Sequence, residues 1–541
     1  MKKYIRFLAL ALALVLSLGI LASCNGGGGG NTQTGDRGED GSWDDVDFGN
    51  KELKVMVSAN EPNETTLGAS VVYTKGPDVT SSDNVLKAVY ERNREVANLL
   101  NINVKYETNN LSYSGVLEDI EKLVQGTNSP DIYVNDIYGI LRAMFNGYLQ
   151  NLLNFGKNPD GTDVQNFFDF TYDGWYADYM KGATLDATKQ YIMAGDYFID
   201  LVRFAWCIFV NVTEFDATFS ELQDWQNYDY TARRIDFAGE WTYDDLITLS
   251  GKAHIDSANK GVTDLDDQRI GFLLNSVIDR VAIFGSGLSC IEWHNADGSL
   301  ASQGYGTPVI VGAEGMGTNP ATLNMLTDVV TEYKKLYRGA GVLPTATLAT
   351  SNAVKEATDQ FINGKAIFAG IILGEMESPT MREVKFTRGV LPFPKYNESQ
   401  EKFLTIVHDQ AEVGAILVTA KSPTMASAYM QALNEKSHKV LTEYYENSLK
   451  VKYNTAGDSE GGVRLMIDKI YETIDSPFES LITNYICNQA STDTSNISLY
   501  SYMTQDAQTG GTQFSTKYKA AVNALQSALN GLYSLYTNRL K

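Results

Sequence analysis

The residues that usually carry catalysis are few in this chain of 541 residues, and their spacing fits none of the common catalytic motifs. The four histidines form no His-Glu-x-x-His pair, which a zinc protease would need. Gly364-Lys365 lacks the upstream glycine and the following Ser or Thr of a phosphate-binding loop, and Ser286 lacks the Gly-x-Ser-x-Gly spacing of a nucleophile elbow. The segment 295–298 lacks the glutamate of a calcium loop. Pairs of carboxylates among the 66 acidic residues leave a glycosidase open.

Cys24 is the residue whose setting points most directly to a chemical event. Three basic residues stand in the first six positions, an apolar stretch runs from 7 to 21, and Ala22-Ser23 precede the cysteine. This pattern predicts a secretory signal over residues 1–23 with Cys24 as the first mature residue, and it resembles the lipobox of bacterial lipoproteins, whose cysteine thiol is acylated. The apolar stretch is shorter than the ~20 residues of a transmembrane helix. The alternative is an ordinary signal peptide with a chance cysteine.

The segment 24–50 is typical of a tether. It opens with five glycines at 26–30, continues with small polar residues and then turns acidic. A flexible coil of this length spans roughly 25–30 Å on average. No strand precedes the glycines, so a phosphate site is not favoured. We expect nothing in this segment to fill a core.

Charge and composition indicate an exported soluble body of two to four domains. The chain has 44 basic and 66 acidic residues, and without the three basic residues of the leader the remaining 41 give the mature part a net charge of −25. Such a protein should bind neither nucleic acid through its phosphates nor anionic lipid through its surface. Acidity by itself identifies no ligand.

Three cysteines remain after Cys24, namely Cys207, Cys290 and Cys487. None stands in a Cys-x-x-Cys pair, and an odd number allows at most one disulfide. The simpler interpretation is that all three are small buried apolar residues.

The first folded segment alternates strands and helices. The hydrophobic pattern predicts strands at 53–57, 102–106 and 131–134, with helices at 83–100 and 116–124 between them. Strands separated by single helices indicate a parallel sheet.

The same pattern resumes further along the chain, with larger inserts. The expected strands are 191–193, 204–210, 365–369 and 411–418, and the expected helices are 242–254, 319–338, 353–363 and 422–436. Thr242 and Asp245 predict a capping box, and Ser422 before Pro423 predicts a helix start. From His438 onward we expect mostly helix.

Several runs are spread over the mature chain in a characteristic order and spacing: Tyr90–Asn93 with Val104–Tyr106, Ser129–Tyr133, Gly147–Leu152, Phe361–Phe368, Gly389–Tyr396, and Tyr444–Glu446 with Leu449–Lys452. Taken together, more than singly, these runs are similar to the bacterial extracellular solute-binding proteins, family 1, which serve ABC importers. The chain departs from the family in apparent insertions at 221–236 and 276–318. It also carries Gly374-Glu375-Met376-Glu377 where Gly-Pro-Trp is familiar, so a stacking tryptophan is missing there.

The resemblance implies an α/β fold of two lobes, the periplasmic-binding-protein-like type II fold, with a central cleft and crossing hinge strands. It places lobe one at 50–198 plus 403–440 and lobe two at 203–402 plus 441–541. Ligands of such folds lie beyond the carboxyl ends of the parallel strands. Residues that follow the expected strands or flank the expected crossing are therefore candidates for ligand binding, together with two tryptophans as stacking platforms: Asn60, Glu61, Asn135, Asp136, Tyr138, Tyr197, Arg203, Glu375, Met376, Trp175 and Trp293.

Asp136 and Arg203 are the strongest candidates, because a charge beside apolar strand residues usually has a partner. For each polar candidate the alternative is a turn or cap role, and for each tryptophan it is a place in the core.

The function that the resemblance implies is capture of a solute outside the cell, with no catalytic site, no metal and no cofactor, and delivery to an ABC permease by a monomer anchored at Cys24. With 31 Tyr, 22 Phe and 6 Trp the chain is aromatic-rich, which suits an oligosaccharide. A peptide or another polar solute stays open, as do a surface-anchored glycosidase and an adhesion or scaffold protein.

If Cys24 carries the lipid, Cys24→Ser releases the protein into the medium or leaves an uncleaved precursor. Stable anchoring needs more than one acyl chain, which the diacylglyceryl group of such lipoproteins supplies. Fractionation of cells that express both forms is the measurement. A Ser variant that is processed and membrane-bound like the wild type contradicts the prediction.

Overall fold

The computed structural model describes residues 35–38, 41–59, 71–111, 115–219, 241–257, 268–275, 278–313, 315–345, 353–450, 462–475, 481–482 and 499–538. The predicted signal, Cys24, the candidates Asn60 and Glu61, Cys487 and the insertion at 221–236 lie outside these residues. Cys207 and Cys290 are buried free thiols, as expected. Among the described residues, no helix combines the length and apolarity needed to cross a membrane.

The first sheet has four strands in the order β14-β3-β1-β2. The three early strands confirm the predictions from alternation, and β1 pairs in parallel with both β2 and β3. The fourth strand comes from late in the chain and runs antiparallel to β3. The bounds are β1 Lys51–Ser58, β2 Ile102–Asn109, β3 Ile132–Asp136 and β14 Glu412–Ile416.

The helices beside this sheet also match the predicted periodicity, as α3 Asn84–Leu99, α4 Val116–Gln125 and α14 Pro423–Lys436. A further helix, α5 Ile137–Phe145, follows β3 directly. Ser422 caps α14 with Pro423 in its first turn, as the sequence indicates. The expected strand 191–193 forms only one bridge, between Met193 and Gly414 of β14.

The second sheet has six strands, in the order β10-β6-β11-β4-β12 with β5 paired to β6. β11 runs parallel to β6 but antiparallel to β4, so the sheet is mixed. All of β4 and β11 is buried. The bounds are β4 Trp206–Asn211, β5 Ile255–Asp256, β6 Gln268–Leu274, β10 Val342–Pro344, β11 Ala366–Ile372 and β12 Arg388–Pro392.

Four helices pack on the second sheet, namely α8 Val212–Phe219, α9 Tyr243–Ala253, α12 Ala353–Ile362 and α17 Gly462–Glu472. The predicted capping box is present, since the Thr242 side chain accepts from the backbone of Asp245 while the Asp245 carboxylate accepts from the backbone of Thr242.

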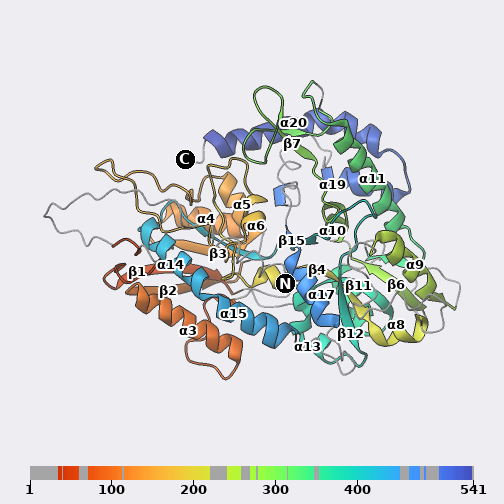
Figure 1. Cartoon of the computed structure of the whole chain (residues 1–541), viewed down its shortest axis with the longest axis horizontal. Helices are drawn as coiled ribbons and strands as arrows, with labels where there is room; N and C mark the ends of the chain where they lie inside the picture. The colour runs from red at the N-terminus through yellow and green to blue at the C-terminus, as the bar shows by residue number, and fades with distance from the viewer. Residues whose placement is uncertain are drawn as a thin grey trace, which may run out of the picture.

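Within the predicted insertion at 276–318, the chain builds a third sheet that the sequence analysis did not resolve. It has the order β8-β7-β9, and all of its pairs are antiparallel. The strands are β7 Ile291–His294, β8 Leu300–Ala301 and β9 Thr307–Ile310. The helices α10 Ile278–Phe284, α11 Pro320–Tyr337, α19 Leu499–Thr509 and α20 Phe514–Asn538 pack with this sheet or with one another. In Figure 1, α11 and α20 curve over the top of the molecule, from the second sheet at the right towards α5 at the left.

Short elements complete the described chain. They are α2 Val71–Thr74, α6 Ala177–Lys181, α7 Asp200–Arg203, the 3-10 helix η3 Leu373–Glu377, α13 Pro379–Arg382, the paired strands β13 Thr405–Ile406 and β15 Ile474–Asp475, α15 His438–Thr442 and the π-helix η4 Glu443–Leu449. The region after 438 is therefore mostly helical where it is described, with β15 as the exception.

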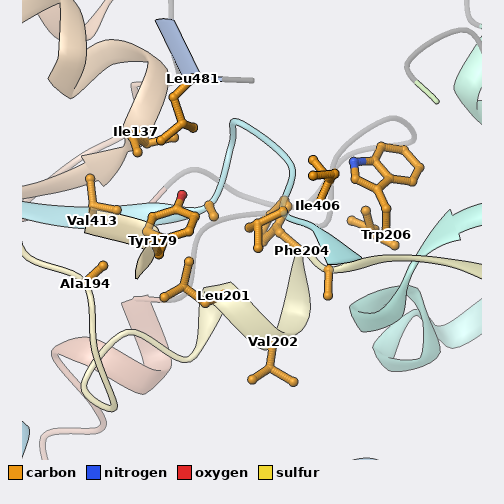
Figure 2. Close-up of a cluster of buried hydrophobic side chains, with 14 of the residues drawn as sticks. Ile137, Tyr179, Ala194, Leu201, Val202, Phe204, Trp206, Ile406, Val413 and Leu481 are labelled. Atoms are coloured by element: carbon orange, nitrogen blue, oxygen red, sulfur yellow. The ribbon is translucent and has the colours of Figure 1, made fainter. Parts of the chain in front are cut away.

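The chain crosses between the first two sheets through segments that share one apolar cluster. Figure 2 shows Ile137, Tyr179 and Val413 at one end of it, Trp206 at the other, and Leu201, Phe204 and Ile406 between them. All of these side chains are buried. Because the cluster draws on two of the crossings, α7 to β4 and β13 to β14, an apolar junction rather than an exposed linker joins the two sheets at these points.

The end of the predicted tether differs from the expectation that nothing in it fills a core. Trp43, Val46 and Phe48 are buried. The Trp43 ring lies 5.6 Å from that of Phe167 and donates its indole N–H to Glu435 at 2.9 Å. Arg37 pairs with the same carboxylate at 2.9 Å and stacks over the Trp43 ring. Three separated apolar residues are enough to dock a short segment on the folded body. The composition of the whole segment, which is polar and rich in glycine, gives no sign of this docking.

If this segment belongs to the fold, Trp43→Ala lowers the free energy of unfolding by ~3 kcal/mol or more, because a buried indole is lost. Trp43→Phe keeps most of the packing but loses the hydrogen bond to Glu435, and should cost only ~1 kcal/mol. Urea unfolding of the mature chain followed by circular dichroism measures both. Midpoints equal to wild type in both variants would show that the segment is not part of the folded body.

Candidate functional site

The candidates from the two sheets converge on the apolar junction between them. At the end of β3, the amide of Ile137 donates to Ala411 O at 2.9 Å, and at the end of β11, the amide of Leu373 donates to Ala205 O at 2.8 Å. These bonds tie each strand end to a crossing segment. Asp136 and Glu375, which lie at or just after these strand ends, therefore belong to one region of the molecule.

Arg203 is the centre of a buried charge network in this region. Its side chain is 4% exposed, and it pairs with Asp200 at 2.6 Å and with Glu377 at 3.3 Å. Burial alone would lower the pKa of Arg203, but Glu377 and Asp200 outweigh it and raise that pKa well above its usual value. The guanidinium is thus a permanent positive charge held between a carboxylate of α7 and one of η3.

The Glu377 carboxylate also accepts hydrogen bonds from two tyrosine hydroxyls. Tyr444 of the π-helix η4 donates to its Oε1, and Tyr73 of α2 donates to its Oε2 at 3.5 Å. The Tyr73 ring lies edge-on to that of Tyr444 at 5.5 Å, and Arg203 sits 5.3 Å from its centre. One carboxylate after β11 therefore joins groups from three other parts of the chain.

Glu375, two residues before Glu377 in the chain, differs from it in its hydrogen bonding. Within the described residues its carboxylate has no hydrogen-bond or ion-pair partner. Burial, and next the charge of Glu377, raise the pKa of Glu375 to about 7. A half-buried carboxyl at the end of a strand, with no partner among the described residues, is suited to accept hydrogen bonds from a polar ligand or to donate one to it.

Asp136 is buried and caps α5, with its carboxylate accepting from the amide of Gly139 at 2.8 Å. Burial, and then the nearby charge of Asp409, raise the pKa of Asp136 to about 7 in spite of this hydrogen bond. The cap role weighed for this residue is therefore present. Asn135 beside it is also buried, and its side-chain oxygen accepts from the amide of Asp136.

A second network, which sequence reasoning missed, surrounds Asp409. Arg280 of α10 donates to this carboxylate at 2.9 Å, and His408 Nδ1 lies 3.1 Å from it. Burial tends to raise the pKa of Asp409, but His408 and Arg280 lower it to about 2. The His408 ring in turn lies 5.4 Å from that of Trp206. The backbone oxygen of Asp409 accepts from the amide of Tyr138, which places Tyr138 next to this network.

Four other candidates are packed in the core. Tyr197 lies under the guanidinium of Arg92 at 4.7 Å, and Trp175 donates its indole N–H to Gln431 at 3.0 Å. Trp293 is a buried residue of β7 in the third sheet, and Met376 is fully buried in η3. The core role weighed for both tryptophans is thus what the structure shows.

The missed residues share a reason. Asp200, Glu377, Tyr444, Tyr73, Arg280, His408 and Asp409 come from separate segments whose meeting no spacing in the sequence announces. Glu377 stands in the run where the chain departs from the family, and Tyr444 stands in a run that matches the family. Neither fact indicated that the two side chains would meet. The described residues contain no group of three or more His, Cys, Asp or Glu side chains placed to hold a metal ion.

No family model matches the chain, and no curated protein matches it in sequence. Solved structures do. The maltose-binding periplasmic protein MalE from Listeria monocytogenes, in complex with maltose, is 13% identical with a TM-score of 0.50, and the match covers 89% of this chain and 98% of that one. A family 1 extracellular solute-binding protein from Bifidobacterium longum subsp. infantis is also 13% identical, with a TM-score of 0.49 and coverage of 89% and 100%.

The likeness to the Listeria protein extends over nearly the whole of both chains. The chain therefore has the two-lobe α/β fold of the periplasmic-binding-protein class, as the sequence analysis expects.

The raised pKa of Asp136 predicts how stability depends on pH. Its pKa of about 7 lies above its ordinary value, so the folded state holds the proton more tightly than the unfolded state. This carboxyl therefore makes stability fall as pH rises between about 4 and 7, and Asp136→Asn should flatten that slope and raise stability at pH 8, since Asn also caps helices. Thermal unfolding of both proteins from pH 4 to 8 is the test, and an unchanged slope contradicts it. Asp409, with its pKa near 2, contributes only below this window.

Proposed function

We propose that this protein is the extracellular substrate-binding component of an ABC importer, that it binds an oligosaccharide, and that it is anchored at the outer face of the cell membrane through a lipid on Cys24. The observation that carries the proposal is the whole-chain likeness in fold to a maltose-binding protein. Such folds bind their solutes between two lobes that close around them. The predicted signal and lipobox add the export and the anchor.

The junction of the two sheets supplies the chemistry that a sugar needs. Glu375 and Asp136 are carboxyls at the carboxyl ends of strands from different sheets, where ligands of α/β folds bind. Carboxylates accept hydrogen bonds from hydroxyl groups, and the fixed charge of Arg203 nearby keeps the Glu377 carboxylate in place. We keep Asn135 and Tyr138 as proposed ligand contacts, and also Asn60 and Glu61, which lie outside the described residues. The lobe boundaries given above are kept as proposed boundaries.

A surface-anchored glycosidase is the rival function. Such an enzyme needs two carboxyl groups set about a scissile bond, one of them protonated to act as general acid. Glu375 has a pKa fit for that role, but its neighbour Glu377 is engaged by Arg203 and two tyrosines. We therefore favour binding without turnover. Delivery to a permease follows from the proposed class, and the proposed form is a monomer without cofactor or metal.

A thermal-shift screen of the mature chain tests the proposal directly. The panel holds linear and cyclic maltooligosaccharides, other plant and host glycans, and peptides. We expect an oligosaccharide to raise the melting temperature, because a ligand that binds only the folded state stabilises it, and we expect chromatography to find no product. Product formation would favour the glycosidase, a shift with peptides only would change the ligand class, and no shift with any compound would remove the binding proposal.

With the ligand found by that screen, Glu375→Ala should weaken binding by ~1–3 kcal/mol, or about 5- to 150-fold, because a hydrogen bond to a charged acceptor is lost. Asp44→Ala removes an exposed carboxylate of the N-terminal segment and is the matched control. Calorimetric titration measures both. Equal affinities for wild type and Glu375→Ala would exclude this carboxyl from the site.

A further inference from the structure

The two bodies of the molecule also meet outside the crossing segments, and one of these contacts involves the end of the described chain. On one side lies the segment 181–191. On the other lie the loop between β8 and β9 and the last turn of α20. Figure 1 shows α20 along the top of the molecule, with its C-terminal end directed towards α5, and α20 packs against α5. We call this contact the far bridge.

The segment 181–191 is fixed to the first sheet. The amide of Leu152 donates to Gln190 O at 2.6 Å. Two residues further on, Met193 and Gly414 of β14 exchange backbone hydrogen bonds at 2.8 and 3.0 Å. This side of the far bridge therefore moves with the first sheet.

The other side is fixed to the third sheet and, through it, to the second. The side chain of Gln526 on α20 accepts from the amide of Ile310 at 2.6 Å, and the hydroxyl of Tyr518 donates to Val311 O at 2.7 Å. α20 also packs on α11, which packs on α9, and α9 lies against β6. This side therefore moves with the second sheet.

Direct hydrogen bonds span the far bridge at two points. At the loop, the amide of Ala187 donates to Gly304 O at 3.0 Å, and Gln303 Nε2 donates to Lys181 O at 2.6 Å and to Thr184 O at 3.1 Å.

At the helix end, Lys189 Nζ donates to the carbonyls of Tyr536 and Thr537 at 3.1 and 2.7 Å, and the Tyr536 hydroxyl donates back to Lys189 O at 3.0 Å. The last carbonyls of a helix lack partners within it and carry a partial negative charge, so an ammonium there is favourable. The Tyr536 ring also packs edge-on against that of Tyr191 at 5.2 Å.

The far bridge differs in kind from the junction at the crossings. The junction is a cluster of buried apolar side chains, which stays intact in water (Figure 2). The far bridge consists mainly of hydrogen bonds to backbone carbonyls, several of them at exposed or half-buried positions, together with one buried ring contact between Tyr191 and Tyr536. Water can replace the hydrogen-bond partners at little cost. Contacts of this kind can break and re-form while the junction acts as the hinge.

We propose that the far bridge is a closure clasp: it holds the two lobes together outside the crossing segments, and the lobes separate only when it opens. The inference concerns the movement of the two bodies and does not depend on which solute the protein binds.

The test uses the mature chain without any ligand, in two variants. Lys189→Met with Tyr536→Phe removes the helix-end bonds and keeps the apolar stem and ring, while Gln303→Ala removes only the loop bonds. Lys517→Met is the matched control, because Lys517 donates to Gln505 within the α19–α20 body and crosses no bridge. Small-angle scattering gives the radius of gyration, and hydrogen exchange reports the amide of Ala187.

We expect the double variant to show a larger radius of gyration and about tenfold faster exchange at Ala187, with the amides of Met193 and Gly414 unchanged. Gln303→Ala should change the radius of gyration and the exchange rate in the same direction but by less. If the double variant fails to fold, the result for Gln303→Ala alone tests the clasp. The control should match the wild type. Unchanged scattering and exchange in Gln303→Ala and the double variant would overturn the proposal. Faster exchange that spreads to Met193 and Gly414 would also overturn it, because the contact would then support the first lobe rather than clasp the two.

Discussion

The charge of Arg203 has to be neutralised inside the apolar junction, and much of the surrounding structure follows from that requirement. A guanidinium cannot shed its proton, and burying it without partners would cost several kcal/mol. Asp200 lies one helical turn away on α7 and neutralises it locally. The second carboxylate, Glu377, comes from the end of β11, so the pairing also fixes where the second sheet meets the crossing segment.

The same network affects the pKa of the carboxyl group next to it, Glu375. Glu377 is drawn towards Arg203, Tyr73 and Tyr444, and its fixed negative charge adds to the effect of burial on Glu375. Asp136 has a parallel relation to Asp409, which Arg280 and His408 keep ionised. In each pair, one carboxyl is held by an arginine and the other is left close to its titration point near neutral pH. Burial, with the charge of the ion-paired neighbour added to it, thus raises the pKa of the two carboxyls that we propose for ligand contact.

The mechanical design rests on the contrast between two kinds of contact. The apolar junction resists separation because its side chains would meet water, whereas the far bridge is formed mainly by hydrogen bonds that water can also make, with a single buried ring contact. The third sheet and α20 extend the second body far enough to reach the first one again. The N-terminal segment around Trp43 packs on α14 and on Phe167, and so belongs to the side of the first sheet.

The sequence by itself determined the elements whose information is local. Alternation and helical periodicity placed β1, β2, β3, α3 and α4, and the chemistry of Thr242 with Asp245 placed the start of α9. The resemblance carried these elements to a two-lobe fold. The third sheet escaped, because its strands are two to four residues long and are stabilised by α11 and α20 rather than by their own pattern.

Only the tertiary structure decided where each candidate lies in the fold. Asp136, Arg203 and Glu375 reach the junction, while Tyr197, Trp175 and Trp293 pack in the core. The partners of the junction come from segments up to hundreds of residues apart, as Tyr73 and Glu377 do. The burial of a charge and the pKa of a carboxyl depend on such partners. The local sequence around a residue does not show which distant residues its partners are.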